Sequence, residues 1–448
     1  MSAPARSIST VPPRRGLCPG LSQPLPTGDG LLVRILPAGT IALEAFAALC
    51  AAARAYGNGI IEVTARGNIQ VRGLTMHSAP RFADTIAAHG IAADDGVPIV
   101  CNPLAGLDAS ERFDGSAFAA TLRRALARQS LALRLDPKVS VVVDSDAALS
   151  LEHLAADIRV RAEVFDGETV LRLAVGGDEV SAFELGVIAA DDGVEAVSRL
   201  LLVLSERGAR ARDIVAMEGS ACFADALAFA RRSVTKCDRE VSAGGQSGDA
   251  IGLHPLRDGS FACGIALAFG HAEAAALEKL VEAAVTVGAR GLRTAPDRGL
   301  LTLGLTRESA VRFFTAATRL GFVTRADDSR RHVIACAGAP LCASAHIAAR
   351  AIAPGLAAAA APYLRDGSSL HISGCAKGCA HPGAAALTVV GKPGDCDLVA
   401  NGSARDAAFA AAPAHELPAL VVAYLRDHDP ATKGNSNVSP SHVSAKHV

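Results

Sequence analysis

The chain has 448 residues, half of them hydrophobic and a fifth charged, so it is long enough for two or three domains with buried cores. Its 44 basic and 45 acidic residues nearly cancel, which argues against binding nucleic acid or a membrane surface through overall charge. The first ten residues lack the apolar core of a secretory signal, and no apolar run is long enough to span a membrane. We therefore expect a cytoplasmic protein whose thiols stay reduced.

The two ends of the chain differ in composition from the rest. Residues 1–15 and 427–448 are rich in polar residues and proline, which predicts a disordered lead-in and a disordered tail. Just after the lead-in, hydrophobic patterns predict a strand, an amphipathic helix and two further strands, in that order. These elements are expected at Leu31–Ile35, Thr40–Tyr56, Ile60–Thr64 and Asn68–Arg72.

The same order of elements returns later in the chain. A strand is expected at Phe261–Leu267, a helix at His271–Val287, and two short strands around Leu292 and at Leu300–Leu303. Residues 73–91 then match residues 304–322 without a gap, with eight identities in nineteen positions. Each matched segment predicts a helix, at Pro80–His89 and at Val311–Leu320. An internal duplication explains this register better than convergent patterning does.

The duplication predicts the fold class, an α+β protein of two pseudo-twofold halves. Each half would begin with a ferredoxin-like β-α-β-β-α half-domain, at 16–97 and 251–329. Each half-domain would be followed by a larger α/β segment, at 98–250 and 330–426. Ligand sites favour such junctions, so we expect the active site where the halves meet.

Four of the eleven cysteines form two pairs within glycine-rich segments. Cys336 and Cys342 are separated by five residues, and Cys375 and Cys379 by three. Structural zinc sites usually show two-residue gaps, whereas these wider gaps suit a bulkier iron–sulfur cluster held by four thiolates. Zinc and uncoordinated thiols are the alternatives. The other seven cysteines are interpreted as small buried residues: Cys18, Cys50, Cys101, Cys222, Cys237, Cys263 and Cys396.

The cysteine pattern and the segment SGCAKGCAHP at 373–382 resemble the cluster motif of the siroheme-dependent sulfite and nitrite reductases. Thr64–Gln70 resembles the T-x-R-x-N-x-Q signature of that superfamily, and its known architecture is also duplicated. The resemblance covers about residues 16–400. It implies a 4Fe-4S cluster on Cys336, Cys342, Cys375 and Cys379, and in the reductases the position of Cys379 also bridges to the siroheme iron.

A smaller branch of the superfamily is more similar. Arg15–Leu21 and Pro26–Leu32 resemble the opening of the precorrin-3B synthases of aerobic cobalamin synthesis. The resemblance implies a monooxygenase that uses molecular oxygen and NADH to hydroxylate precorrin-3A and close a lactone onto ring A. It also implies a separate mononuclear iron, for which His371 and His381 are candidate ligands, although a lone histidine is more often structural.

The chain departs from the reductases at the residues that hold their anion. Aligned by motif, Arg66 matches one reductase arginine, but Val97 stands where a second is found. In the K-x-K motif, Lys138 matches the first lysine and Ser140 replaces the second. The reduction of a small oxyanion depends on positive charge around it. Because two of the four basic residues are replaced here, we favour a tetrapyrrole substrate that is held through its carboxylates.

The resemblance assigns roles to six basic or polar residues. Arg66, Lys138 and Lys377 are the predicted catalytic residues, and the predicted substrate-binding residues are Arg66, Asn68, Lys138, Arg293 and Arg298. Each has an ordinary alternative: Arg66 as a surface charge at a strand end, Lys138 as a solvated strand entrance, and Lys377 as a counter-charge in the cluster loop. Arg293 and Arg298 also resemble an R-x-x-P-x-R pattern of the branch.

Two other functions stay open at this point. One is a sulfite or nitrite reductase with bound siroheme, and the other is a non-catalytic iron–sulfur electron carrier. The chain shows no convincing glycine-rich dinucleotide fingerprint. We therefore expect NADH to act through a partner, either a reductase or a ferredoxin.

Overall fold

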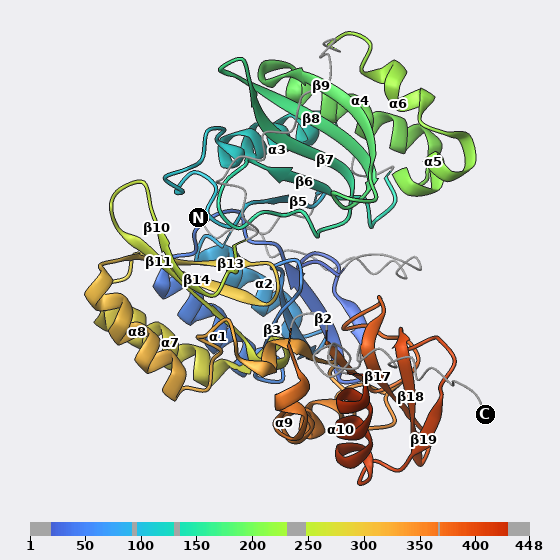
Figure 1. The fold of residues 1–448 in the computed structure, drawn as a ribbon. Coiled ribbons are helices and arrows are strands. Elements are labelled where there is room, and N and C mark those ends of the chain that lie inside the picture. Colours follow the sequence, from blue (N-terminus) through green and yellow to red (C-terminus); the bar gives the residue numbers. More distant parts are fainter. Residues whose placement is uncertain (1–18, 92–95, 130–134, 231–247, 366–367, 429–448) are drawn as a thin grey trace, which may run out of the picture. The chain divides into compact units, whose positions relative to one another are not determined.

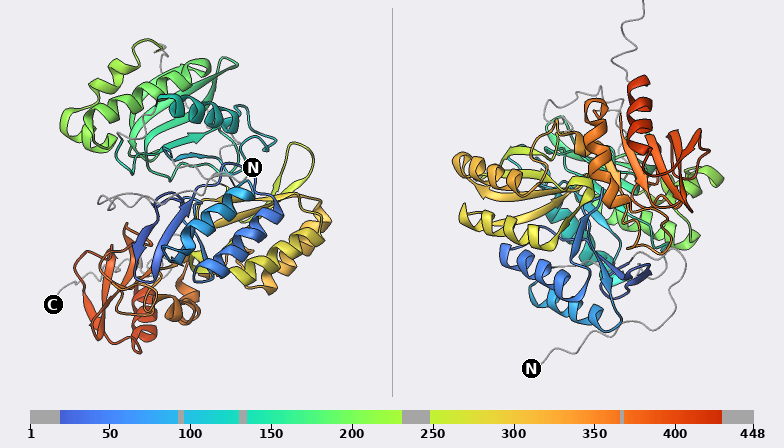
Figure 2. Two further views of the ribbon diagram at one scale, coloured as in Figure 1. Left: turned by 180° about the vertical axis from the view of Figure 1, so that it is seen from behind. Right: turned by 90° about the horizontal axis from the view of Figure 1, so that it is seen from below.

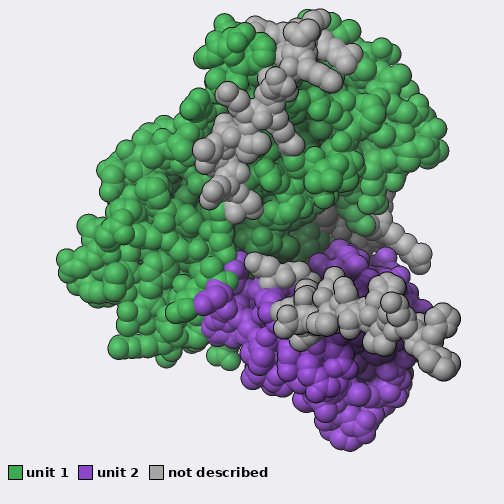
Figure 3. Space-filling model, viewed as in Figure 1, with its two compact units in different colours: residues 1–326 green, residues 327–448 purple. Residues whose placement is uncertain are grey.

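The computed structural model describes residues 19–91, 96–129, 135–230, 248–365 and 368–428. The chain divides into two compact units, unit 1 at 1–326 and unit 2 at 327–448 (Figure 3). The predicted lead-in 1–15 and the tail beyond residue 428 lie outside the described residues, as do Cys18 and Cys237.

The first half-domain of unit 1 follows the predicted order of elements (Figure 1). Its elements are β1 (Leu25–Thr27), β2 (Gly30–Ile35), α1 (Leu43–Tyr56), β3 (Ile60–Val63), β4 (Ile69–Leu74) and α2 (Ser78–Ala88). The strands form an antiparallel sheet in the order β1-β2-β4-β3, and β12 from the second half-domain adds a fifth strand beside β3. The helices bury Phe46, Leu49 and Phe82.

The second half-domain repeats this arrangement. Its elements are β10 (Gly252–Pro255), β11 (Phe261–Ala266), β12 (His271–Glu273), α7 (Ala274–Thr286), β13 (Gly291–Ala295), β14 (Gly299–Leu305) and α8 (Arg307–Arg319). The sheet order is β10-β11-β14-β13. The helix expected from His271 begins only at Ala274, because the three preceding residues pair with β3 as a strand.

The two half-domains exchange backbone pairing. The segment before α7 pairs with β3 of the first half-domain, with His271 opposite Glu62. Reciprocally, Ile41, just before α1, pairs with Leu292 of β13 through N–H···O bonds of 2.7 and 2.8 Å. This pairing also explains why α1 begins at Leu43 and not at the expected Thr40. One hydrophobic core runs through both half-domains, and the blue and yellow helices lie side by side over it (Figure 2).

The matched segments fold alike in atomic detail. Before α2, the N–H of Thr75 donates to Ser78 Oγ and the N–H of Ser78 donates to Thr75 Oγ1, both at 2.9 Å. Before α8, Thr306 and Ser309 form the same two bonds at 3.0 and 3.1 Å. These reciprocal bonds satisfy N–H groups that a helix leaves unpaired at its start. The duplication predicted from sequence therefore extends to the helix caps.

The remainder of unit 1 is an α/β segment. It contains β5 (Ile99–Cys101), α3 (Gly115–Gln129), β6 (Val141–Asp144), β7 (Ala156–Phe165), β8 (Glu168–Gly177), β9 (Phe183–Ala189), α4 (Gly193–Arg207), α5 (Ala211–Glu218) and α6 (Ala221–Ala226). The strands pair in sequence order, β5-β6-β7 in parallel and β7-β8-β9 antiparallel. The strand expected at residues 139–143 is β6, which begins two residues later.

Unit 2 has a sheet of the same design. It contains β15 (Val333–Ala335), α9 (Ala349–Ala360), β16 (Leu370–Ser373), β17 (Ala385–Lys392), β18 (Asp395–Gly402), β19 (Ala410–Ala412) and α10 (Leu417–Asp427). Here β15-β16-β17 are parallel and β17-β18-β19 antiparallel. Both parts of the duplication are thus present, and the predicted α+β fold is confirmed. No helix among the described residues is long and apolar enough to cross a membrane.

Candidate functional site

The paired cysteines of unit 2 lie at one edge of its sheet. Cys336 directly follows β15, and Cys375 lies two residues beyond the end of β16. The two strands are parallel, with Ala335 opposite Ile372, so their carboxyl ends share an edge. The N–H of Cys336 donates to the Ile372 carbonyl at 3.1 Å, which continues the pairing up to the first cysteine. The sheet therefore brings together two segments that are almost forty residues apart.

Glycines allow the two cysteine loops to touch. The N–H of Gly374 donates to Sγ of Cys336 at 3.0 Å. A Cβ at residue 374 would lie 2.6 Å from the Cβ of Ala345, and a Cβ at Gly338 would lie 2.3 Å from the Ala349 nitrogen. Both distances are far below van der Waals contact, so the loops need glycine at these two positions.

Two further hydrogen bonds connect the loops. The N–H of His346 donates to the Gly374 carbonyl at 2.8 Å. Nζ of Lys377 donates to Oγ of Ser344 at 2.8 Å. Lys377 therefore connects the second cysteine loop, in which it lies, to the segment that follows the first. Its catalytic role stays a prediction.

The chemistry of this donor set fits an iron–sulfur cluster. The pKa of the Cys336 thiol is raised, chiefly because the thiol is buried. The thiols of Cys342 and Cys375 raise this pKa as well, whereas hydrogen bonds from the N–H groups of Gly374 and Gly338 lower it. The Cys336 thiol is therefore electrostatically coupled to one cysteine of its own loop and one of the other loop. Among the described residues, no group of three or more His, Cys, Asp or Glu side chains is arranged to hold a metal ion. In a cubane each thiolate binds a different iron, and N–H donors to sulfur stabilise its negative charge.

The two candidate histidine ligands lie beside the second cysteine pair. His371 is fully buried on β16, and its ring meets that of His381 edge-on, with centroids 5.6 Å apart. Nε2 of His381 lies 3.1 Å from the Ala384 carbonyl. This local hydrogen bond and ring contact give His381 a structural role without any iron. Iron ligation by either histidine stays a prediction.

In unit 1, two pseudo-equivalent turns carry Arg66 and Arg298 and meet each other. The N–H of Asp297 donates to the Ala65 carbonyl at 3.0 Å. Asp297 and Arg298 both have positive φ, 55° and 68°, which costs energy for residues with a side chain. Arg298 is half-buried, its stem lies over Gly270, and burial lowers its pKa. The structure thus brings together the two turns that carry these arginines, which are more than two hundred residues apart in sequence.

Arg66 also contacts the α/β segment of unit 1. Its Nη1 donates to Oγ of Ser140 at 3.3 Å, and its Nη2 donates to the Ala155 carbonyl. Ser140 is buried, and its N–H donates to Oδ2 of Asp157 at 3.0 Å. The residue that replaces a reductase lysine is therefore a buried hydroxyl that accepts a hydrogen bond from Arg66.

A cavity of about 80 Å³ adjoins Arg66. Arg123 from α3 and Arg293 from β13 line it as well, together with the loop 36–39, residues 99–103 and Pro296. Arg293 is held by Oγ1 of Thr40 at 2.9 Å and by the Ala105 carbonyl at 2.8 Å. Sequence patterns did not single out Arg123, because two arginines in succession on an amphipathic helix are typical of a solvated face.

Arg66 and Arg293 are the two predicted substrate-binding residues that line this cavity, whereas Arg298, Lys138 and Asn68 do not line it. Lys138 is exposed, and its own N–H donates to Asp136 Oδ1 at 2.8 Å in a local turn. Oδ1 of Asn68 is buried without a hydrogen-bond partner among the described residues. Neither residue lines the cavity. Their predicted roles are therefore not supported by it, and they stay predictions.

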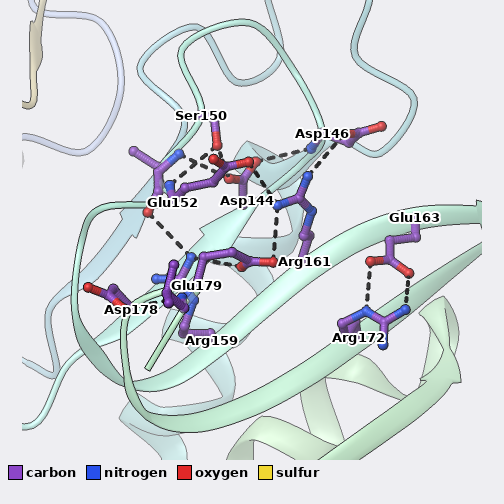
Figure 4. A network of polar contacts seen from close by, with 12 residues as sticks. Asp144, Asp146, Ser150, Glu152, Arg159, Arg161, Glu163, Arg172, Asp178 and Glu179 are labelled. Atoms are coloured by element: carbon purple, nitrogen blue, oxygen red, sulfur yellow. Dashed lines mark hydrogen bonds and ion pairs between the residues drawn. The ribbon is translucent and has the colours of Figure 1, made fainter. Parts of the chain in front are cut away.

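A network of charges orders the loop after β6 (Figure 4). Arg161 of β7 forms ion pairs with Glu152 at 3.2 Å and Glu179 at 3.3 Å, and Glu179 also pairs with Arg159 at 3.3 Å. Asp144 accepts hydrogen bonds from the hydroxyl of Ser150 and from the backbone that follows it. This loop occupies the place in the unit 1 sheet that the second cysteine loop occupies in the sheet of unit 2.

Comparisons with known proteins agree with this architecture. Residues 23–89 match the family model of the nitrite/sulfite reductase ferredoxin-like half domain. A ferredoxin–nitrite reductase of Synechococcus elongatus is 23% identical, over 82% of this chain and 77% of its own length. The solved structure of the Mycobacterium tuberculosis NirA protein superposes with a TM-score of 0.73 at 18% identity, covering 91% of this chain and 82% of that one.

A higher identity is found with another known protein. A precorrin-3B synthase of a Sinorhizobium species is 39% identical over 398 residues, which cover 88% of this chain and 84% of that protein. Identity of this level over nearly the whole of both chains leaves little room for a different fold or domain content. The chain therefore belongs to the precorrin-3B synthase family.

Proposed function

We propose that this protein is a precorrin-3B synthase: a monooxygenase that hydroxylates precorrin-3A and forms the ring A lactone in aerobic cobalamin biosynthesis. The observation that carries the proposal is the 39% identity with the Sinorhizobium precorrin-3B synthase across 88% of the chain. The product gains one oxygen atom from O2. The second oxygen atom leaves as water, after taking two electrons from NADH and two protons.

The surroundings of Arg66 support a large substrate over a small oxyanion. Where the reductases carry a second lysine, this chain places the buried hydroxyl of Ser140, which accepts a hydrogen bond from Arg66 at 3.3 Å. Val97, which stands for the missing arginine, is buried and apolar. Fewer charges weaken the stabilisation of a multiply charged small anion. A guanidinium can still bind one carboxylate arm of a tetrapyrrole.

The residues of unit 2 fit a cluster. Cys336, Cys342, Cys375 and Cys379 would hold a 4Fe-4S cluster, which supplies one-electron transfer when bound. The N–H of Gly374 already donates to Cys336 Sγ, and Lys377 places a positive charge across the two loops. Both groups would favour the negative charge of the cluster. NADH would deliver electrons through a partner reductase or ferredoxin.

One assay tests the proposed reaction. The purified protein is incubated with precorrin-3A, a reductant and O2, and the product is analysed by mass spectrometry. We expect a mass gain of one oxygen atom, carrying the label when ¹⁸O2 is used. Cys336→Ser should abolish the gain, and Cys222→Ser, which changes a thiol outside the two pairs, should leave it intact. An unlabelled or unchanged product from the wild type would refute the proposal.

A siroheme reductase is the second candidate, favoured by the 23% identity with a ferredoxin–nitrite reductase. The absorption spectrum of protein purified without oxygen separates the two functions. Siroheme bands that persist through purification, with reduction of sulfite or nitrite, would favour the reductase. Cluster absorption without turnover of precorrin-3A, sulfite or nitrite would indicate an electron carrier.

A further inference from the structure

The cavity beside Arg66 gathers positive charge from three separate elements. Arg66 comes from the turn after β3, Arg123 from α3 and Arg293 from β13. The only other ionisable group among the described lining residues is the thiol of Cys101. All three side chains are positively charged, so each of them attracts an anion that enters the cavity they line.

Arg123 and Arg293 both act on the thiol of Cys101, which lines the same cavity. Burial raises the pKa of Cys101 to about 12. Arg123 and Arg293 lower the pKa of that thiol, whereas Glu111 and Asp114 raise it. Burial also lowers the pKa of Arg293, while Glu111 and Asp114 raise it. The two acids influence the site without lining the cavity.

Backbone contacts fix two of the guanidiniums. Arg293 donates to the carbonyls of Pro103 and Ala105 at 3.1 and 2.8 Å, and Arg123 donates to the Ile99 carbonyl at 3.0 Å. Ser116, in the first turn of α3, lines the same cavity and presents the positive end of a fifteen-residue helix. Positioned donors of this kind favour a planar anion that accepts several hydrogen bonds.

The size of the cavity sets the size of the anion. Pockets for whole drug-sized ligands usually measure about 300–1,000 Å³. A cavity of about 80 Å³ accommodates a few heavy atoms, such as one carboxylate with its methylene group, and cannot hold a macrocycle. We propose that the cavity lined by Arg66, Arg123 and Arg293 is a subsite for a single carboxylate, and that Arg123 is a specificity-determining residue within it.

The carboxylate has two possible sources. One is an acetate or propionate arm of the tetrapyrrole, and this source rests on the proposed function. The other is a free small carboxylate such as acetate. The Arg123→Gln variant tests both, with Arg123→Lys as the charge-conserving variant and Arg124→Gln as the matched control. Arg124 is the exposed next residue of α3 and donates only locally, to Thr121 Oγ1 at 2.9 Å.

The first measurement is the Kd of a stable octacarboxylate porphyrin, uroporphyrin III, from titration of each variant. A charge-assisted hydrogen bond contributes about 1.5–3 kcal/mol, so Arg123→Gln should weaken binding about tenfold to a hundredfold. Arg123→Lys should recover part of the loss, and Arg124→Gln should bind like the wild type. The octamethyl ester of the porphyrin carries no carboxylate, so its Kd should be the same for Arg123→Gln and for the wild type.

The second measurement is the thermal midpoint in rising concentrations of sodium acetate, with sodium chloride as reference. Stabilisation by acetate of the wild type and Arg124→Gln, but not of Arg123→Gln, would support the site and indicate a free carboxylate. The proposal is overturned when Arg123→Gln matches Arg124→Gln in both measurements. The two proposals can fail separately. If the wild type does not convert precorrin-3A but Arg123→Gln still weakens porphyrin binding, the proposed function is refuted and the carboxylate site is retained.

Discussion

The backbone N–H of Ser145 donates a hydrogen bond to Oδ1 of Asn102 at 2.6 Å. The equivalent bond in unit 2 runs from Gly374 to the thiol of Cys336 at 3.0 Å. Both acceptors directly follow the first strand of their sheet, and both donors directly follow the second, parallel strand. The two halves therefore share one backbone design at this edge and differ in the side chain that accepts the bond.

The two halves therefore offer different chemical groups at this edge. In unit 1 the amide of Asn102 also donates to Asp144 Oδ1 at 3.1 Å, and both residues are buried. A hydrogen-bonded amide and carboxylate close the strand ends without any ligand. In unit 2 the same place offers thiols, which are the ligands that iron–sulfur clusters use. This difference explains why a duplicated chain is expected to carry one cluster.

We predict that serine at Cys336, Cys342, Cys375 or Cys379 abolishes cluster binding. Each thiolate would bind a different iron, and a hydroxyl is a poor replacement for it. Iron and acid-labile sulfide are measured in protein purified without oxygen. Cys222→Ser should retain full iron and sulfide, because that thiol belongs to neither loop. A variant of any of the four that keeps a full cluster would remove that residue from the ligand set.

Gly374→Ala should disrupt the cysteine loops, because the added Cβ would lie 2.6 Å from Cβ of Ala345. Overpacking of this kind typically costs about 1–3 kcal/mol. We expect a lower thermal midpoint and a reduced iron content. The control is Gly383→Ala in the same region, where the nearest atom would be 3.7 Å away. Equal behaviour of the two variants would contradict the close packing of the loops.

His153 should stabilise the protein only at acidic pH. The hydrogen bond with Asp297, at 3.3 Å, raises the pKa of His153 above its ordinary value. Because the pKa of His153 is higher in the folded state than in the unfolded state, protonation of His153 stabilises the folded protein. This stabilisation is complete at pH values below the unfolded-state pKa, about 6.5, and disappears as the pH rises through the folded-state pKa. Because the side chains are 47% and 59% exposed, the effect should be at most about 1 kcal/mol.

Urea unfolding of the wild type and His153→Gln measures this effect at pH 5.5 and pH 9. We expect the variant to be less stable at the lower pH and indistinguishable at the higher one. His89→Gln, at an exposed site after α2, serves as the control for losing a histidine. A loss of equal size at both pH values would show that packing, and not charge, is responsible.

Thr306→Ala should destabilise the second half-domain by about 1 kcal/mol, the usual cost of losing a helix N-cap. The hydroxyl accepts from the N–H of Ser309 at 3.1 Å and completes a capping box. Thr315→Ala is the matched control, since that hydroxyl only bonds the Val311 carbonyl within the same helix. Chemical denaturation gives both free energies of unfolding. The expectation fails when Thr306→Ala costs no more than Thr315→Ala.

Local patterns gave the elements of the half-domains but not the contacts between them. The helix starts expected at Thr40 and His271 were wrong by three residues each, because both segments pair with a strand of the other half-domain. Pairing between distant segments leaves no signal in the local periodicity. Arg123 was missed for the same reason, because its cavity is lined by residues from five separate segments of the chain.

The sequence by itself determined the duplication, the α+β fold and the four paired cysteines, because these depend on periodicity, register and spacing along the chain. Only the tertiary structure decided that Ser140 accepts a hydrogen bond from Arg66, and that Asn102 occupies the place of Cys336 in the first half. It also decided that Arg66, Arg123 and Arg293 line one cavity. Such contacts join residues that are far apart in sequence, and chain folding alone sets the distances between them.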